Sequence, residues 1–554
     1  MDKNEISDYK EFNSVIEQLN QLIEKQSNHI KQLIHIGESL SAKNSLVNIF
    51  NLILSEAMHY CNADGGTIYV VSSDGQYLDF KLMFNVSLNQ KMGDVDSPIT
   101  WPSVPLFNID ESPNMNHMVS YVYHTKESKA FDDVYEQNLF DNTGTKKYDK
   151  RNNYRSKSMV AIPLINHEDE VMGVIQLINA QDEENKTIGF NEDHLLMLNS
   201  LASQAAISLS NSRLIENLEE LLLQFIKSIA TAIDRKSKYT AGHVKRVATL
   251  TEKMARAVNN DEDGAFENVY FSSDQLKEIS MSGWMHDVGK IVIPECIMDK
   301  STKLEKIIDR IELIRIRSDL LKEVIRKDIL TFERDGILTL EKRNKLENII
   351  AQIEKDYRLI EKLNIGSESL PDNLKNEIQR IQDFSYFSNG REYKIITDDE
   401  AKNLKIYRGT LTDEEFLVMK DHAQVTWDML SPLQFPKKYE NVPLYASSHH
   451  ERLNGKGYPN KYPEQKIPLQ ARIIAVADVF EALLSDRPYK AGKKLSDALK
   501  IIAYMVKDHE LDSRIVDLLL DSGLYLSFAR DIVKVKKDLI DSFEIEEIKK
   551  IYRE

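Results

Sequence analysis

The chain begins with a stretch in which apolar residues recur every three or four positions in a polar background. Within residues 1–40 they stand at Val15, Leu19, Leu22, Ile30, Leu33 and Ile34. This spacing predicts an amphipathic helix. Such a helix either pairs with the same helix of a second chain or packs on the domain that follows it.

Between residues 41 and 212 the pattern changes to short apolar runs separated by polar turns, which predicts a mixed α+β domain. Residues 159–165 and 171–179 are apolar enough for two buried strands, and 63–71 predicts a turn entering a third. A helix is expected to start near Asn191. This arrangement resembles a GAF domain, a sensor fold in which helices cover an antiparallel sheet. The resemblance implies a site for a small-molecule ligand.

Some GAF domains bind cyclic nucleotides and carry a signature of Asn-Lys, Phe and Asp-Glu. Asn179, Phe190 and Asp193 match it, but Ala180 and His194 stand where the Lys and the Glu would be. Three alternatives therefore stay open for this domain. It binds a cyclic nucleotide, it binds another small molecule, or it serves only for dimerisation.

Residues 194–235 predict one long, nearly unbroken helix, because apolar side chains recur at helical spacing from Leu195 to Ile229. This helix would join the sensor domain, over residues 41–212, to the remainder of the chain. It either passes a small rotation or register shift onward or acts as a rigid spacer.

Five short motifs of the C-terminal half carry histidine or aspartate. In chain order they contain His243, the pair His286 and Asp287, His422, the pair His449 and His450, and Asp478. Adjacent imidazoles are poor core residues, because burial has to satisfy both nitrogens of each ring, but they are good ligands for transition metals. The order of the motifs, with Gly457-Tyr458-Pro459 after the histidine pair, resembles the HD-GYP family of cyclic di-GMP phosphodiesterases. The resemblance covers residues 210–299 and 405–520.

The resemblance implies an all-α HD-type catalytic domain over residues 213–554 and two divalent metal ions, with iron or manganese favoured by mixed His and Asp ligands. It assigns to one ion His243, His286, Asp287 and Asp478. It assigns to the other ion Asp287, His422, His449 and His450. Two ions that share a carboxylate can lower the pKa of a water molecule and stabilise phosphoryl oxygens. The implied reaction is hydrolysis of cyclic di-GMP to pGpG, with slow further cleavage to GMP.

The same resemblance names the residues expected to contact the substrate. They are Lys290, Gly457, Tyr458, Pro459, Arg487 and Lys490. Lys290 follows Asp287 by three residues and so lies on the same helix face. With Asp287 it makes up the expected catalytic pair. Some family members hold a third ion with a glutamate one turn before the first histidine. Here Tyr239 stands at that position, and phenol is a poor ligand at neutral pH, so two ions are expected.

A long insertion separates the second motif from the third. In the family pattern this connection is short, but here about a hundred residues separate Glu305 from Leu411. Residues 304–330 and 338–363 predict two helices, broken near Gly336, that form an antiparallel hairpin. The insertion, at about 304–408, is a lid, a dimer contact or a decoration without a role.

Composition restricts the classes of function further. A net charge of −16 argues against a broad basic surface for DNA, and no apolar run of about 18 residues predicts a membrane span. The first residues lack the apolar core of a secretion signal. Cys61 and Cys296 are the only cysteines and make no disulfide framework. A cytoplasmic location is therefore expected.

Together these patterns predict a multidomain enzyme, a GAF-regulated and metal-dependent phosphodiesterase that forms a homodimer. One alternative is an HD-type phosphohydrolase that acts on another cyclic dinucleotide or on a nucleotide. The other is an adaptor that binds cyclic di-GMP without turnover.

Overall fold

The computed structural model describes residues 20, 27, 46–93, 97, 99, 101–237, 242–262, 264–366, 369–486 and 492–553. The helix predicted over residues 1–40 lies outside the described residues, apart from two isolated positions, and so do Tyr239, Arg487 and Lys490. The chain divides into two compact units, Met1–Leu221 and Leu222–Glu554. The division falls nine residues after the predicted boundary at 212. No helix among the described residues combines the length and the apolar composition needed to cross a bilayer.

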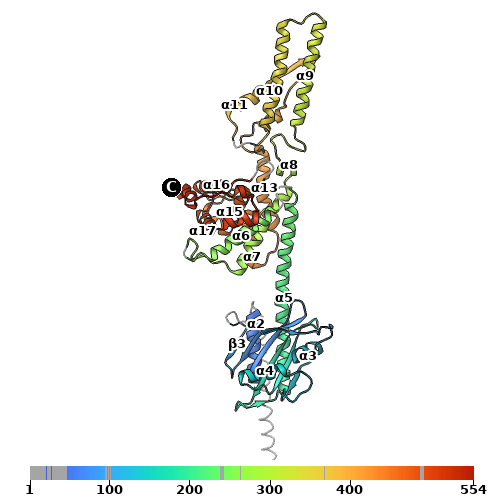
Figure 1. Cartoon of the computed structure of the whole chain (residues 1–554), viewed down its shortest axis with the longest axis vertical. Coiled ribbons are helices and arrows are strands. Elements are labelled where there is room, and N and C mark those ends of the chain that lie inside the picture. Colours follow the sequence, from blue (N-terminus) through green and yellow to red (C-terminus); the bar gives the residue numbers. More distant parts are fainter. Residues whose placement is uncertain are drawn as a thin grey trace, which may run out of the picture. The chain divides into compact units, whose positions relative to one another are not determined.

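The first unit is built on an antiparallel sheet (Figure 1), and its strands follow the order β3-β2-β1-β7-β6-β5. Strand β4 pairs with β2, and β8 pairs with β7. The strands are β1 (Ala63–Val71), β2 (Tyr77–Asn85), β3 (Gln90–Met92), β4 (Val104–Pro105), β5 (Lys129–Phe131), β6 (Met159–Ile165), β7 (Val171–Gln181) and β8 (Thr187–Ile188). The three strands predicted from apolar runs are β1, β6 and β7.

Helices cover both faces of this sheet. They are α2 (Leu46–Cys61), α3 (Met118–Thr125), α4 (Thr143–Asn152) and α5 (Glu192–Asp234). Successive side chains of a strand point to opposite faces, so Val160 and Ile162 pack with α2 and α5 in one hydrophobic cluster. Met159 and Ala161 pack with α3 in the other. This is the α+β arrangement predicted from the sequence.

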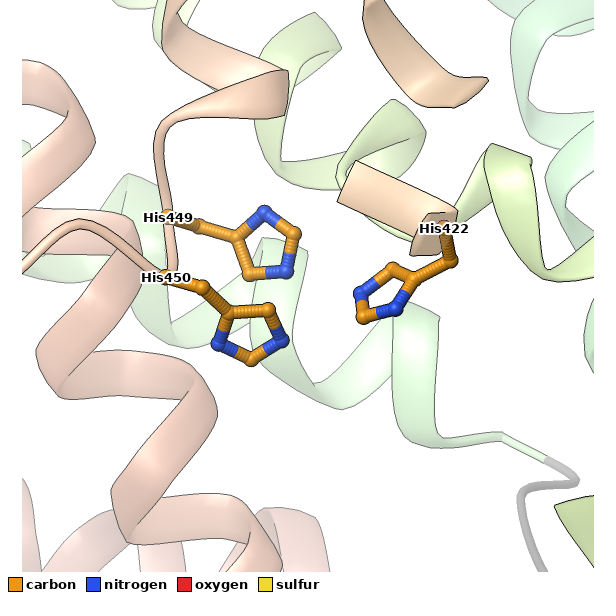
Figure 2. Close-up of side chains that lie close together, drawn as sticks. All are labelled: His422, His449 and His450. Carbon is orange, nitrogen blue, oxygen red and sulfur yellow. The ribbon is translucent and has the colours of Figure 1, made fainter. Parts of the chain in front are cut away.

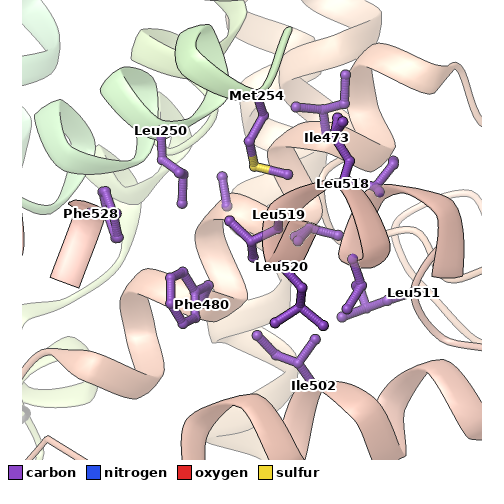
Figure 3. Close-up of a cluster of buried hydrophobic side chains, with 14 of the residues drawn as sticks. Leu250, Met254, Ile473, Phe480, Ile502, Leu511, Leu518, Leu519, Leu520 and Phe528 are labelled. Carbon is purple, nitrogen blue, oxygen red and sulfur yellow. The ribbon is translucent and has the colours of Figure 1, made fainter. Parts of the chain in front are cut away.

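The second unit is helical outside one small hairpin of strands. Its main helices around the histidine motifs are α6 (His243–Asn259), α7 (Ser273–Met285), α13 (Asp413–Leu430), α14 (Val442–Ser447), α15 (Leu469–Leu484), α16 (Leu495–Lys507), α17 (Ser513–Asp521) and α19 (Ile545–Arg553). A short 3-10 helix, η1 (Val288–Val292), follows α7. Figure 3 shows the core that α6, α15, α16 and α17 share, with Leu250, Phe480 and Leu519 among its fully buried side chains. Asp512 caps α17, and its side chain accepts from the backbone amide of Arg514.

The insertion contains the predicted helical hairpin, and α9 (Ile311–Arg334) and α10 (Leu340–Leu363) run side by side (Figure 1). Helix α9 begins seven residues later than predicted, because residues 304–310 form a turn in which the Arg310 guanidinium donates to the carbonyl of Leu304. Four further elements complete the insertion, and none of them was predicted individually. They are α11 (Asp372–Asp383), the pair β9 (Tyr386–Ser388) and β10 (Arg391–Tyr393), and α12 (Asp398–Leu404).

The insertion has its own hydrophobic core, and at its base it is joined by hydrogen bonds to the helices around the histidine motifs. Ile314, Ile353 and Ile378 are among the buried residues that α9, α10 and α11 share. At the base, the buried Lys300 donates to Glu415 Oε2 at 2.7 Å and to Asn403 at 2.9 Å. Both ends of the insertion are therefore held at one place.

Candidate metal centre

The seven predicted metal ligands come from five separate segments and lie in one cluster. His243 is the first residue of α6, and His286 and Asp287 directly follow α7. Figure 2 shows how His422 of α13 faces His449 and His450, which follow α14. Donor atoms lie within 4.8 Å of one another in three groups: His243, His286 and Asp478; His422, His449 and His450; and His286, Asp287 and His449.

Asp287 lies between the first two groups. Its Oδ2 atom is 3.3 Å from Nε2 of His243 and 3.2 Å from Nε2 of His286, while its Oδ1 atom is 3.5 Å from Nε2 of His422. The two oxygens of one carboxylate thus face two different groups of imidazoles. A bridging ligand needs this placement.

The protein fixes the orientation of each inner imidazole through its other nitrogen. Nδ1 of His286, His422 and His449 lies 2.8, 2.6 and 2.7 Å from the main-chain carbonyl three residues earlier. Because a carbonyl can only accept, Nδ1 carries the proton and Nε2 keeps its lone pair. These Nε2 atoms are buried and have no hydrogen-bond partner among the described residues.

His243 is oriented by a side chain instead. Its Nδ1 contacts Oε2 of Glu481, a fully buried carboxylate three residues after Asp478 on α15. Glu481 is held in turn by Arg246, with Nη2 to Oε1 at 2.7 Å, and by Ser485, with Oγ to Oε1 at 2.6 Å. His243 starts its helix, and its N-cap Gly242 has a left-handed backbone, so no helical turn supplies a carbonyl. We did not predict Glu481, although its position on the Asp478 face of α15 was a usable signal.

Burial and neighbouring charges shift the pKa values of these groups in different directions. Burial lowers the pKa of His449 to about 3 and also lowers the pKa of His422. Burial would lower the pKa of His243 as well, but the Glu481 carboxylate raises it well above the usual range. For Asp287, burial is outweighed by the Lys290 ammonium and the imidazoles, which hold its pKa well below the usual range.

Close packing of main chains brings the second and third motifs together. A Cβ atom at Gly289 would lie 2.0 Å from the carbonyl oxygen of His422 and 2.7 Å from the amide nitrogen of Thr426. The hydroxyl of Thr426 donates to the carbonyl of His286 and accepts from the amide of Gly289, both at 3.1 Å. Helix α13 can therefore approach the end of α7 only because residue 289 has no side chain.

The loop at residues 455–459 closes one side of the cluster. The Tyr458 ring lies against His450, with 4.7 Å between ring centroids. Gly457 does permit a close approach, but its neighbour is the main chain of Glu451 and Arg452, not an open space for a ligand. The buried Glu451 carboxylate accepts from the amides of Asn460 and Tyr462 and so fixes the loop. Glu451 was missed by sequence reasoning.

Lys290 reaches the cluster from η1. Its Nζ donates to Oδ2 of Asp287 at 2.6 Å, and its side chain keeps 17% of its surface exposed. Of the predicted substrate contacts outside the 457–459 loop, Lys290 is the only one among the described residues. The other two, Arg487 and Lys490, lie outside them. Because the Lys290 ammonium lies at the partly exposed edge of the buried histidine cluster, it can contact an anionic ligand while it remains beside Asp287.

The donor set fits a transition-metal site. Imidazole nitrogen and carboxylate oxygen suit first-row divalent ions better than calcium. Nδ1 of His286, His422 and His449 donates to a main-chain carbonyl, and Nδ1 of His243 faces the Glu481 carboxylate. Metal-bound histidines usually have such a partner on the nitrogen that does not bind the metal. The region therefore has groups of His and Asp able to hold metal ions.

Comparisons with known protein families agree with the two units. A GAF domain model matches residues 45–209, and an HD domain model matches residues 396–515. The HD match includes His422, the histidine pair and Asp478, but its linear range leaves out the motifs that precede the insertion. It also begins before residue 408, where we expected the insertion to end. Among solved structures, the GAF domain of an Acinetobacter phosphoenolpyruvate-protein phosphotransferase covers 34% of this chain at 15% identity, with a TM-score of 0.26.

Curated relatives match part of the chain. Over 113 residues it is 45% identical to the cyclic di-GMP phosphodiesterase response regulator RpfG of Xanthomonas campestris, covering 20% of this chain and 29% of the relative. Over 94 residues it is 43% identical to a cyclic di-GMP phosphodiesterase of Thermotoga maritima, covering 17% and 25%. Over 111 residues it is 37% identical to the 3'3'-cGAMP-specific phosphodiesterase 1 of Vibrio cholerae, covering 20% and 25%.

The chain thus spans between a quarter and three tenths of the length of these three relatives. It contains a GAF domain followed by an HD domain, and part of it is similar to cyclic dinucleotide phosphodiesterases.

Proposed function

We propose that this chain is a metal-dependent phosphodiesterase that hydrolyses cyclic di-GMP to pGpG, and that its GAF domain regulates the reaction. The observation that carries the proposal is the gathering of five imidazoles and two carboxylates in one buried cluster. The buried Nε2 atoms without hydrogen-bond partners among the described residues support it, because burying unpaired polar atoms costs stability unless a ligand satisfies them.

Two divalent ions, iron or manganese, would occupy the cluster in the division implied by the resemblance. One ion takes His243, His286, Asp287 and Asp478. The other takes Asp287, His422, His449 and His450. Two of the three geometric groups support this division, the third takes His286 from one side and His449 from the other, and Asp287 faces imidazoles of both sides. When bound, such ions stabilise charge on phosphoryl oxygens and lower the pKa of water.

The chain's own residues supply binding and orientation. Lys290 holds a phosphate oxygen of the substrate, and its ammonium stabilises the negative charge that grows there during hydrolysis. Tyr458 and the adjoining Pro459 form the wall beside the histidine pair and contact the dinucleotide. Arg487 and Lys490 are proposed to bind its second phosphate or a guanine edge, because guanidinium offers a planar donor fork.

The relatives carry two specificities in their names, cyclic di-GMP and 3'3'-cGAMP. Cyclic di-GMP is proposed first because the two most similar of the three relatives bear that name. Activity on another cyclic dinucleotide is the second candidate. Whether pGpG is cleaved further to GMP is decided by the same assay.

The test is turnover by the full chain, purified without oxygen, with metal content determined on the same sample. Cyclic di-GMP and 3'3'-cGAMP are offered in parallel, and pGpG formation with about two iron or manganese ions per chain is expected. The exposed His509 gives a matched control, since His509→Asn should leave both results unchanged. Full metal loading without turnover of either substrate would contradict the proposal and favour an adaptor.

A homodimer is proposed through α5. In the first unit this helix exposes Ile207, Leu214, Leu218 and Leu221, with Asn211 in the same stripe. The four apolar residues follow one another at intervals of seven, four and three positions, which fits the heptad of a coiled coil. In coiled coils an Asn at a core position, such as Asn211 here, sets the register and the number of chains. The cytoplasmic location expected from the sequence stays a prediction.

Light scattering of the full chain at micromolar concentration tests the dimer. The double substitution Leu214→Glu and Leu218→Glu should convert a dimer mass to a monomer mass, because four carboxylates would face one another across the stripe. Glu216→Gln, outside the stripe, is the control. A monomer mass for the unmodified chain would contradict the proposed homodimer.

A further inference from the structure

The GAF domain contains a cavity of about 860 Å³ on the face of its sheet that carries α3. Strands β1, β2, β6 and β7 form its floor, and α3 and α4 contribute its sides. A volume of this size holds a whole small molecule. The cavity lies in a different unit from the metal centre, and none of the residues proposed for catalysis lines it.

One wall of the cavity is a row of aromatic rings. Phe80 stands between Tyr69 and Trp101, with ring centroids 4.6 and 5.4 Å away, and Tyr148 lies 5.8 Å beyond Trp101. All four residues line the cavity. The Tyr69 and Phe80 rings are tilted at 51°, and the other two pairs are edge to face, so the row presents both ring faces and ring edges on which a further ring can pack. This wall favours a planar aromatic ligand over a flexible aliphatic one.

The floor offers a polar pair. The Tyr69 hydroxyl donates to Oε1 of Gln176 at 2.9 Å. The amide nitrogen of Gln176 faces the sulfur of Met159 at 2.7 Å. A thioether is a weak acceptor, so this amide gains a better partner when a ligand brings a carbonyl or a ring nitrogen. The floor therefore favours a ring that carries a hydrogen-bond acceptor.

The charged residues that line the cavity are mostly cations. They are Lys91, Lys147 and Arg151, against one carboxylate, that of Asp141. Lys147 and Arg151 are four residues apart on α4 and therefore lie on the same face of the helix. The Asp141 carboxylate accepts from the backbone amide of Thr143 at 2.8 Å and is occupied in this turn. In a chain with a net charge of −16, this local excess of cations favours an anionic ligand.

We infer that the GAF cavity binds a planar aromatic ring that bears both a hydrogen-bond acceptor and an anionic group, a carboxylate or a phosphate. The ring packs against the row from Tyr69 to Tyr148, its acceptor takes the Gln176 amide, and its anion meets Lys147 and Arg151. Nucleoside monophosphates and aromatic carboxylic acids share this chemistry. This inference does not rest on the proposed function.

The test is isothermal titration calorimetry of the full, metal-loaded chain with two matched pairs of probes. One pair is guanosine monophosphate and guanosine, and the other is indole-3-carboxylate and indole. In one pair at least, the anion should bind about 10-fold tighter than its neutral partner, the gain from a charge-assisted contact. The pair that shows this difference identifies the source of the ligand.

Variants locate the binding. The double substitution Lys147→Gln and Arg151→Gln should remove the advantage of the anion, while Lys150→Gln, which does not line the cavity, should leave it. Tyr148→Leu should weaken both members of a pair. If neither anion binds, if neutral probes bind equally well, or if Lys147→Gln with Arg151→Gln changes nothing, the inference is wrong. The last result would place the nucleotide at the metal centre instead. Circular dichroism confirms that each variant is folded.

Discussion

The metal centre and the GAF cavity both gather polar side chains among apolar ones, but they hold them differently. At the metal centre the Nδ1 atoms of His286, His422 and His449 are fixed by main-chain carbonyls, so the free nitrogens point inward before any ion arrives. In the GAF cavity the Gln176 amide faces the sulfur of Met159, a weak acceptor that a ligand oxygen or nitrogen could replace. The first site suits a ligand of fixed geometry. The second suits a ligand that completes the site.

The largest effect that separates the two sites is expected from Asp287→Ala. Removing the carboxylate that faces both imidazole groups should lower turnover of cyclic di-GMP at least about 1000-fold. Probe binding in the GAF cavity should stay the same, because no cavity residue changes. Turnover is measured by product chromatography and binding by calorimetry. Undiminished turnover in the variant would remove Asp287 from the mechanism.

Glu481→Gln tests whether the orientation of His243 contributes to metal affinity. The amide keeps the shape of the side chain but loses the charge that orients His243, so metal affinity should fall about 10–100-fold. Metal content after dialysis against a graded chelator measures this. Ser485→Ala is the matched control, because it removes one hydrogen bond to Glu481 and leaves the carboxylate. A fall in thermal stability without a change in metal content would make Glu481 purely structural.

Gly289→Ala probes the contact that joins α13 to the end of α7. The added Cβ would lie 2.0 Å from the carbonyl oxygen of His422. Overpacking of this kind costs about 1–3 kcal/mol and should displace His422 from the cluster. Gly144→Ala in the GAF cavity is the contrasting variant, since nothing lies within 4 Å of its Cβ position. Urea unfolding followed by circular dichroism compares the two. Equal stability for both variants would contradict the packing argument.

The smallest effect is expected from Tyr69→Phe in the GAF cavity. It removes the hydroxyl that donates to Gln176 and should lower the free energy of unfolding by about 1 kcal/mol. Metal content and turnover should be unchanged without a GAF ligand. A large fall in metal content would show that the two sites are coupled even in the absence of ligand.

The sequence predicted the cluster well because its histidines and aspartates belong to short motifs with a distinctive order. All seven predicted ligands lie together, although His243 and Asp478 are more than two hundred residues apart in the chain. The strands β1, β6 and β7 were equally accessible, since buried strands read as continuous apolar runs.

Two of the residues that were missed, Glu481 and Thr426, act through partners distant in sequence, whereas Glu451 was missed although its partners Asn460 and Tyr462 follow within eleven residues. Glu481 orients a histidine 238 residues earlier, and the role of Thr426 depends on Gly289, which is 137 residues before it. No local pattern records such pairings. Gly457 was expected to contact the substrate, which stays a prediction, and nothing in the sequence indicated that the main chain of Glu451 and Arg452 packs against it. The start of α9 was misplaced because a charged, apolar-striped turn has the same composition as a helix.

The base of the insertion has a consequence for how far the length of this segment matters to the rest of the unit. The main chain of Lys303 pairs with that of Asn364, and the Thr410 hydroxyl donates to the carbonyl of Lys300 at 2.9 Å. A module whose two ends meet at one point costs its host little conformational entropy, because closing a longer loop costs only slightly more than closing a short one. The length of the insertion can therefore change with little effect on the helices that hold the histidine cluster. The same junction offers protein engineers a place to exchange the hairpin for a different module.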